Sequence, residues 1–128
     1  MRVFLDTNVI VGAVSARGLC TDVLREVLAR HELVVSDVLL DEVRTVLVGK
    51  IGVSGDIVSE VIALLRDGAV MASPDPADSA LISAAIHGKA AVFVTGDLKL
   101  QALRDALGGP GSPAIVSPRE FWNHLRKP

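Results

Sequence analysis

The sequence has little of several features that mark common classes of protein. It contains one cysteine, Cys20, which cannot form a disulfide within the chain. Aromatic residues make up 3% of the chain, and tyrosine is absent. No apolar stretch reaches the ~18 residues that a membrane-spanning helix needs. These absences argue against a disulfide-stapled secreted domain and against a membrane protein, and they predict a location in the reducing cytoplasm.

Strong charge and the common ligand-binding motifs are missing as well. The formal net charge is −2, which argues against a wholly basic nucleic-acid binder but not against a metal-dependent one. No glycine-rich nucleotide loop of the P-loop or dinucleotide type is present. The three histidines His31, His87 and His124 lie far apart and lack the spacing of a zinc site. The scattered arginines and the basic C-terminal residues are interpreted mainly as solvated surface.

What the sequence has is apolar residues in short runs. Half of its residues are hydrophobic, and residues 1–128 are expected to form one domain around one core. Strand-like runs are predicted at residues 3–5, 33–35, 69–71, 91–94 and 114–116. Helices are predicted at residues 8–15, 21–30, 37–47, 56–66, 77–86, 98–107 and from 118 onward. Gly49 and Gly52 are expected to interrupt the chain after the third helix. Ser36, Ser54 and Ser117 are the predicted N-caps. This alternation predicts a three-layer α/β/α domain with a central, mostly parallel sheet.

Asp6 and Asp97 each stand just beyond a predicted buried strand. Residues 3–5 lead directly into Asp6, and residues 91–94 lead into Asp97 with two residues between. In open parallel sheets, binding sites lie at the carboxyl ends of the strands. Two carboxylates brought to that edge repel each other unless a cation lies between them, and oxygen ligands with water suit Mg²⁺ or Mn²⁺. The pair therefore predicts a divalent-cation site suited to phosphodiester chemistry.

Two further acids can reach the same edge. Glu42 lies one and a half turns into the helix that follows the second predicted strand, and Asp78 begins a helix of small apolar residues. Each also has a simpler interpretation, because Glu42 can be a solvated helix residue and Asp78 a helix cap or dipole partner. Asp6 is the stronger candidate, since an acid directly after a buried strand is costly unless it is paired or metal-bound.

In their order along the chain these segments resemble PIN-domain ribonucleases. The closest branch is that of toxin components of toxin–antitoxin pairs (VapC-like). The resemblance rests on the strand followed by Asp6-Thr7-Asn8, on residues 36–47 around Glu42, on residues 75–85 around Asp78, on Phe93-Val94-Thr95-Gly96-Asp97 and on residues 115–121. No single segment is specific, and the ordered set spans nearly the whole chain.

The resemblance implies a metal-dependent ribonuclease with an acidic pocket. Its implied metal-binding and catalytic residues are Asp6, Glu42, Asp78 and Asp97, holding Mg²⁺ (or Mn²⁺), with Thr7, Asn8 and Thr95 supporting them. A metal-activated water would then hydrolyse the phosphodiester bond. The chain has fewer acids around Asp78 than many members of this branch, which leaves Asp75 as a competitor; Asp78 is preferred because it continues directly into the helix, whereas Asp75 precedes a proline.

Expected partners follow from the same resemblance and from composition. The resemblance favours an RNA substrate, although hydrolysis by water does not exclude DNA, and it implies an antitoxin protein. The high apolar content predicts a homodimer or an antitoxin surface on the helices at residues 21–30 and 56–66. Two other classes remain open: a catalytically silent PIN-like interaction module, and a receiver-like phosphoacceptor, which is disfavoured because Asp6 has no acidic neighbour.

Overall fold

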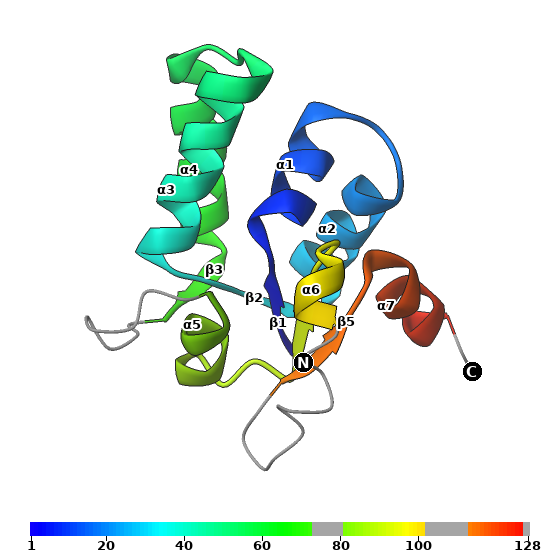
Figure 1. The fold of residues 1–128 in the computed structure, drawn as a ribbon. Coiled ribbons are helices and arrows are strands. Elements are labelled where there is room, and N and C mark those ends of the chain that lie inside the picture. The colour runs from blue at the N-terminus through cyan, green and yellow to red at the C-terminus, as the bar shows by residue number, and fades with distance from the viewer. Residues whose placement is uncertain (73–80, 102–112, 127–128) are drawn as a thin grey trace.

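The protein is built on a five-stranded sheet. Its computed structural model describes residues 1–72, 81–101 and 113–126. Within these residues the strand order is β3-β2-β1-β4-β5, and every neighbouring pair is parallel. The strands are β1 (Arg2–Leu5), β2 (Glu32–Val35), β3 (Ala69–Met71), β4 (Val92–Val94) and β5 (Ala114–Val116) (Figure 1). The predicted parallel sheet is confirmed, with β1 and β2 each starting one residue earlier and β4 one residue later than expected.

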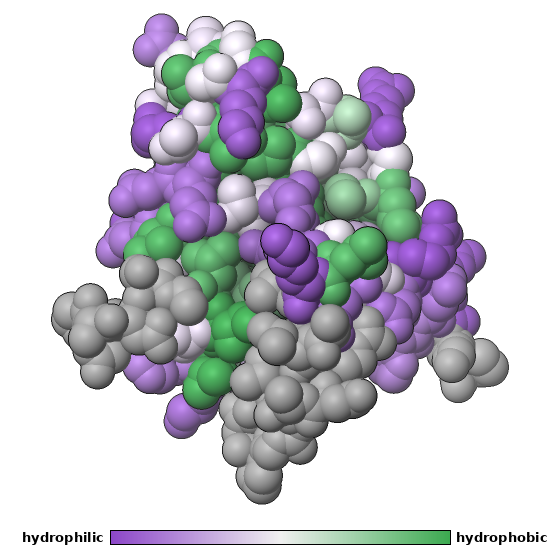
Figure 2. Space-filling model, viewed as in Figure 1, coloured by the Kyte–Doolittle hydropathy of each residue, from purple (hydrophilic) through white to green (hydrophobic). Residues whose placement is uncertain are grey.

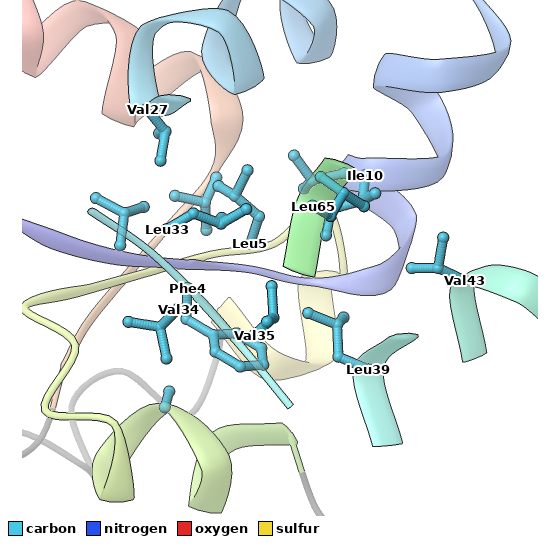
Figure 3. Packing of buried hydrophobic residues seen from close by; sticks show 14 of the residues in the cluster. Phe4, Leu5, Ile10, Val27, Leu33, Val34, Val35, Leu39, Val43 and Leu65 are labelled. Carbon is cyan, nitrogen blue, oxygen red and sulfur yellow. The ribbon is translucent and has the colours of Figure 1, made fainter. Parts of the chain in front are cut away.

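Helices cover both faces of the sheet. They are α1 (Thr7–Ser15), α2 (Leu19–Arg30), α3 (Asp37–Val46), α4 (Gly55–Asp67), α5 (Leu81–His87), α6 (Leu98–Gln101) and α7 (Pro118–Leu125). Figure 3 shows Val27 of α2 on one side of the strand residues and helix α5 on the other. This arrangement is the expected three-layer α/β/α fold.

The central strands are buried on both sides, as their apolar runs indicated. Val3, Phe4 and Leu5 of β1 are fully buried, which explains why this strand has no alternation of polar and apolar residues. Phe4 stacks on Phe93 of the neighbouring strand β4, with ring centroids 5.2 Å apart and planes 11° from parallel. The core therefore holds β1 and β4 rigidly side by side, and both strands end at the same edge.

The third helix departs from the prediction at its C-terminal end. Instead of stopping at Leu47 and being interrupted at Gly49, the chain continues in a π-helical turn, η1 (Leu47–Ile51). Gly52 ends this turn with a left-handed φ of 82°, a conformation that glycine adopts without steric cost. Its N–H donates to the carbonyl oxygen of Leu47. Gly49 thus does not break the helical run, because a single glycine weakens a helix without forbidding it.

The three predicted serine N-caps are confirmed. Ser36, Ser54 and Ser117 each cap a helix by accepting a backbone N–H through the side-chain oxygen. Ser117 and Glu120 form a reciprocal capping box in front of α7. The predicted helix segments at residues 77–80 and 102–107 lie outside the described residues. No described helix is long and apolar enough to cross a membrane.

Candidate functional site

Asp6 and Asp97 lie at the carboxyl edge of the sheet, where the sequence placed them. Asp6 follows β1, and its backbone N–H donates to Val94 O of β4 at 2.8 Å, so the two strand ends are adjacent. Both aspartates line one open cavity of about 500 Å³, together with Thr7 and Asn8 of α1. The parallel pairing of β1 with β4 thus brings together two carboxylates that are 91 positions apart in the sequence numbering.

Asp6 is buried and extensively hydrogen-bonded. Only 6% of its surface is exposed. One carboxylate oxygen accepts the backbone N–H of Thr7 at 2.8 Å, and the other accepts the Thr95 hydroxyl at 2.6 Å and the Asn8 amide at 3.4 Å. Because Asp6 also precedes the first turn of α1, the positive end of that helix dipole faces its charge. These contacts fix the carboxylate in one orientation.

The pKa of Asp6 lies above its ordinary value. Burial is the largest cause, since it penalises the charged form. The hydrogen bonds from the Thr95 hydroxyl and the Thr7 backbone oppose the rise, and the negative charges of Glu42 and Asp97 add to it. Both neighbouring acids therefore act on Asp6 electrostatically, as members of a repelling cluster do.

Thr95 connects the two aspartates. Its side chain is fully buried. Its hydroxyl donates to Asp6 and accepts the backbone N–H of Asp97 at 3.0 Å. Asp97 itself is exposed and accepts, at 2.8 Å, the backbone N–H of Lys99 in the first turn of helix α6 (Leu98–Gln101). A single hydroxyl thus sets the position of one carboxylate directly and of the other through its backbone.

Asn8 makes a second connection between Asp6 and the loop that carries Asp97. Its amide nitrogen lies 3.4 Å from Asp6, and its amide oxygen accepts the backbone N–H of Gly96 at 3.1 Å. The loop after β4 is therefore attached to α1 as well as to β5, where Thr95 N–H donates to Val116 O at 2.9 Å. The segment that carries Asp97 is held on both sides.

Glu42 lies beside this cavity, not inside it. It lines an adjoining cavity of about 380 Å³ along α3. The Thr7 hydroxyl donates to its carboxylate at 2.7 Å, while the Thr7 backbone donates to Asp6. Thr7 and Val46 line both cavities. Thr7 therefore links the third acid to the aspartate pair.

The residues that the structure brings together have the chemistry of a site for a hard divalent cation. No group of three Asp, Glu, His or Cys side chains within the described residues forms a compact ligand cluster. Mg²⁺ does not require one, because it keeps several waters and commonly binds through one or two carboxylates. Among the described contacts, one oxygen of Asp97 and one of Glu42 accept no hydrogen bond. Carboxylate oxygens facing an open, water-accessible cavity fit Mg²⁺ or Mn²⁺.

The other predicted acid cannot be placed. Asp78 and its competitor Asp75 lie outside the described residues, so the convergence of the four carboxylates stays a prediction. Among the described residues, Asp6 and Asp97 share one cavity and Glu42 lines the adjoining one. Two contributors were not singled out from the sequence. Gly96 donates a backbone N–H, and Lys50 lines the cavity from η1. A lysine between Gly49 and Ile51 carries no pattern of its own, and its position depends on the π-helical turn.

Comparison with known proteins identifies the class. The sequence profile of the PIN domain matches residues 2–99, which is most of the chain. The chain belongs to the PIN-domain family. No curated protein matches it significantly. The profile covers β1 to β4 with Asp6, Glu42 and Asp97, the elements that form the cavities.

Among solved structures, the fold is similar to that of one chain in the crystal structure of VapBC2 from Rickettsia felis bound to a DNA fragment from their promoter. The TM-score is 0.59 at 13% sequence identity, over 91% of this chain and 98% of that one. At this identity the likeness concerns the fold. The predicted family and the predicted three-layer fold are both confirmed.

Proposed function

We propose that the protein is a metal-dependent ribonuclease that hydrolyses RNA phosphodiester bonds at the cavity lined by Asp6 and Asp97. One observation carries the proposal: in a chain of the PIN-domain family, two carboxylates from neighbouring strand ends lie in one open cavity, with a third acid attached through Thr7. Burial is the main cause of the raised pKa of Asp6, and the charges of Glu42 and Asp97 add to it; a bound cation offsets both effects by stabilising the charged form.

Each acid has a distinct role in this proposal. Asp6 and Asp97 hold Mg²⁺ or Mn²⁺, with Glu42 beside them and Asp78 as the expected fourth acid. When bound, the cation lowers the pKa of a water and neutralises charge that develops on the phosphate. Thr95, Thr7 and Asn8 hold the carboxylates in place, which preserves the geometry that the cation needs. Without the cation, the acidic cavity repels a polyanion.

The substrate is proposed to be RNA, and the assay is direct. Purified protein is incubated with labelled single-stranded RNA and with DNA of the same sequence, in Mg²⁺, in Mn²⁺ or in EDTA. We expect RNA cleavage with either metal and none in EDTA. The acids need a bound cation, and without it their negative charge repels the RNA. Equal cleavage in EDTA would exclude the metal-dependent mechanism. Absence of cleavage with every substrate and metal would favour the catalytically silent interaction module.

We further propose that this single nuclease domain, residues 1–128, acts in the cytoplasm as the toxin of a toxin–antitoxin pair. The fold similarity to a chain of the VapBC2 structure supports this role. A metal-dependent nuclease without a restraining partner endangers its own cell, so expression alone should arrest growth. Co-expression with the product of the neighbouring reading frame should relieve the arrest.

A homodimer is the second assembly that we propose. Apolar side chains stay exposed on the two helices named from the sequence: Leu28 on α2 at 48%, and Ile57 and Leu64 on α4 at 54% and 72%. Figure 2 shows apolar surface at the top of the view, over the hairpin formed by α3, η1 and α4. Surface of this kind is typical of interfaces.

Sedimentation velocity tests the dimer. The wild-type protein is expected to sediment as a dimer at high micromolar concentration, and Leu64→Asp is expected to shift it toward monomer, because it places a charge in the interface. Lys89→Asp, a charge change at an exposed position in the turn between α5 and β4 and outside both helices, serves as the comparison. A wild-type monomer at these concentrations would reject the dimer.

A further inference from the structure

Among the residues that the structure describes, Lys50 is the basic one that lines the cavity of Asp6 and Asp97. The described lining consists of Asp6, Thr7, Asn8, Val11, Gly12, Val46, Lys50 and Asp97. Lys50 comes from η1, an element separate from the strand ends that supply the two acids. The described part of the cavity therefore has two acidic side chains, Asp6 and Asp97, at the sheet edge and the basic side chain of Lys50 on another side.

The π-helical turn accounts for the position of Lys50. Val46 and Lys50 are four residues apart and line the same cavity, so they share one face of the helical run. Their neighbours Val48 and Ile51 are exposed instead, at 45% and 48%. Gly52 closes the turn in the left-handed conformation immediately after Ile51. Short π-helical turns of this kind occur frequently at functional sites.

Lys50 has no structural partner among the described residues. The ion pairs found there join Arg2 with Glu32, Arg30 with Glu26, and Arg66 with Asp37. Lys50 is exposed, although it is near an acidic cluster. The four-carbon stem can lie along the apolar wall at Val46 while the ammonium group stays in the cavity. The positive charge of Lys50 is therefore available to a ligand that enters the cavity.

We propose that the Lys50 ammonium group binds a backbone phosphate of the single-stranded RNA substrate, next to the phosphodiester group held at Asp6 and Asp97. The inference rests on the proposed function and names a substrate contact within it. A polyanion entering this cavity meets the repulsion of the acids, and only the phosphate at the reacting centre is compensated by the cation. The next phosphate needs a positive charge from the protein, and an ammonium group is a suitable point-charge donor.

The test compares Lys50→Gln, Lys50→Arg and the matched control Lys89→Gln. Lys89 is also exposed, and it lies in the turn before β4, at the opposite edge of the sheet. Values of kcat and KM for labelled single-stranded RNA are measured at several salt concentrations with saturating metal. Losing one phosphate contact should lower the salt slope of log(kcat/KM) by about 0.7, which is about fivefold per decade of salt.

The expected pattern is specific to a substrate contact. Lys50→Gln raises KM at low salt with little change in kcat, Lys50→Arg retains most of the wild-type kcat/KM, and Lys89→Gln behaves as wild type. Thermal midpoints stay equal in all four proteins. The inference is overturned if Lys50→Gln matches Lys89→Gln in KM and salt slope, or if Lys50→Arg loses as much as Lys50→Gln.

Failure of the proposed function is distinguishable from failure of this inference. If the wild type cleaves RNA and Lys50→Gln is unaffected, only the inference fails. If the wild type does not cleave, the RNA stays intact, and fluorescence anisotropy then gives its equilibrium affinity for the same proteins. A salt slope lowered by Lys50→Gln in that measurement supports the phosphate contact; an unchanged slope, or no RNA binding by the wild type, overturns it.

Discussion

Asp6→Asn and Asp97→Asn are each expected to abolish metal-dependent RNA cleavage while leaving the domain folded. The amide keeps the shape of the carboxylate but loses the charge that attracts the cation. The expected loss is about 10²–10³-fold or more, the range seen when a group that stabilises developing charge is removed. Initial cleavage rates with saturating Mg²⁺ or Mn²⁺ measure the effect.

The Asp6 variant has a second expected signature, in stability. The pKa of Asp6 is higher in the folded state than in the unfolded state. Its bound proton therefore stabilises the fold fully at pH values below the unfolded-state pKa, and this stabilisation is lost as the pH rises through the folded-state pKa. At neutral pH the buried, repelled charge is therefore unfavourable without metal. Asp6→Asn removes that charge, and its metal-free thermal midpoint should be equal to or higher than that of the wild type.

The matched control is Asp67→Asn. Asp67 ends α4 and is exposed just before β3, at the opposite edge of the sheet. Its replacement also removes one carboxylate from the chain, but it should leave the cleavage rate unchanged. Undiminished cleavage by Asp6→Asn or Asp97→Asn would contradict the proposed roles of these residues. A large drop in the midpoint of Asp6→Asn would show that the carboxylate is needed for folding.

Thr95→Val is expected to lower activity about 10–100-fold, the usual cost of losing a group that orients a metal ligand. Valine nearly matches threonine in shape but cannot donate to Asp6 or accept from the Asp97 backbone. Both carboxylates then lose a constraint, and the pKa of Asp6 should rise further because the hydroxyl stabilises its charged form. The activity loss should appear mainly as a higher metal requirement.

Metal titration separates this effect from direct loss of a ligand. Raising Mg²⁺ or Mn²⁺ should restore much of the Thr95→Val cleavage rate and little of the Asp97→Asn rate. Thr21→Val is the matched control, since its hydroxyl donates to the carbonyl groups of Ala13 and Ala16 between α1 and α2. A Thr95→Val enzyme with the metal requirement of the wild type would show that Thr95 does not position the acids.

Much of the fold could be predicted because local signals agreed with one another. Apolar runs such as residues 3–5 are long enough for a strand and too short for a helix, and serines before the helices supplied N-caps at Ser36, Ser54 and Ser117. The π-helical turn at the end of α3 was missed. Its backbone pattern depends on packing of the α3–α4 hairpin, and Gly49 suggested a break that the tertiary structure overrides.

The site was predicted in part, and for a similar reason. Acids placed just after strands have positions set by the topology, so the sequence alone indicates that Asp6 and Asp97 lie together. Thr95 was named as a supporting residue through the family resemblance alone, because its hydroxyl reaches Asp6 across 89 positions of sequence and no local pattern encodes such a contact. Lys50 was not predicted as a site residue, because only the geometry of η1 places it in the cavity.

Calorimetric titration of Mn²⁺ into metal-free wild-type protein, Asp97→Asn and Asp67→Asn measures the proposed cation site itself, independently of any substrate. Wild type and Asp67→Asn should bind Mn²⁺ with the same affinity, and Asp97→Asn should show no saturable binding in the same concentration range, because it lacks one of the two carboxylates that share the cavity. Mn²⁺ binding by Asp97→Asn with wild-type affinity would contradict a metal site at this edge of the sheet.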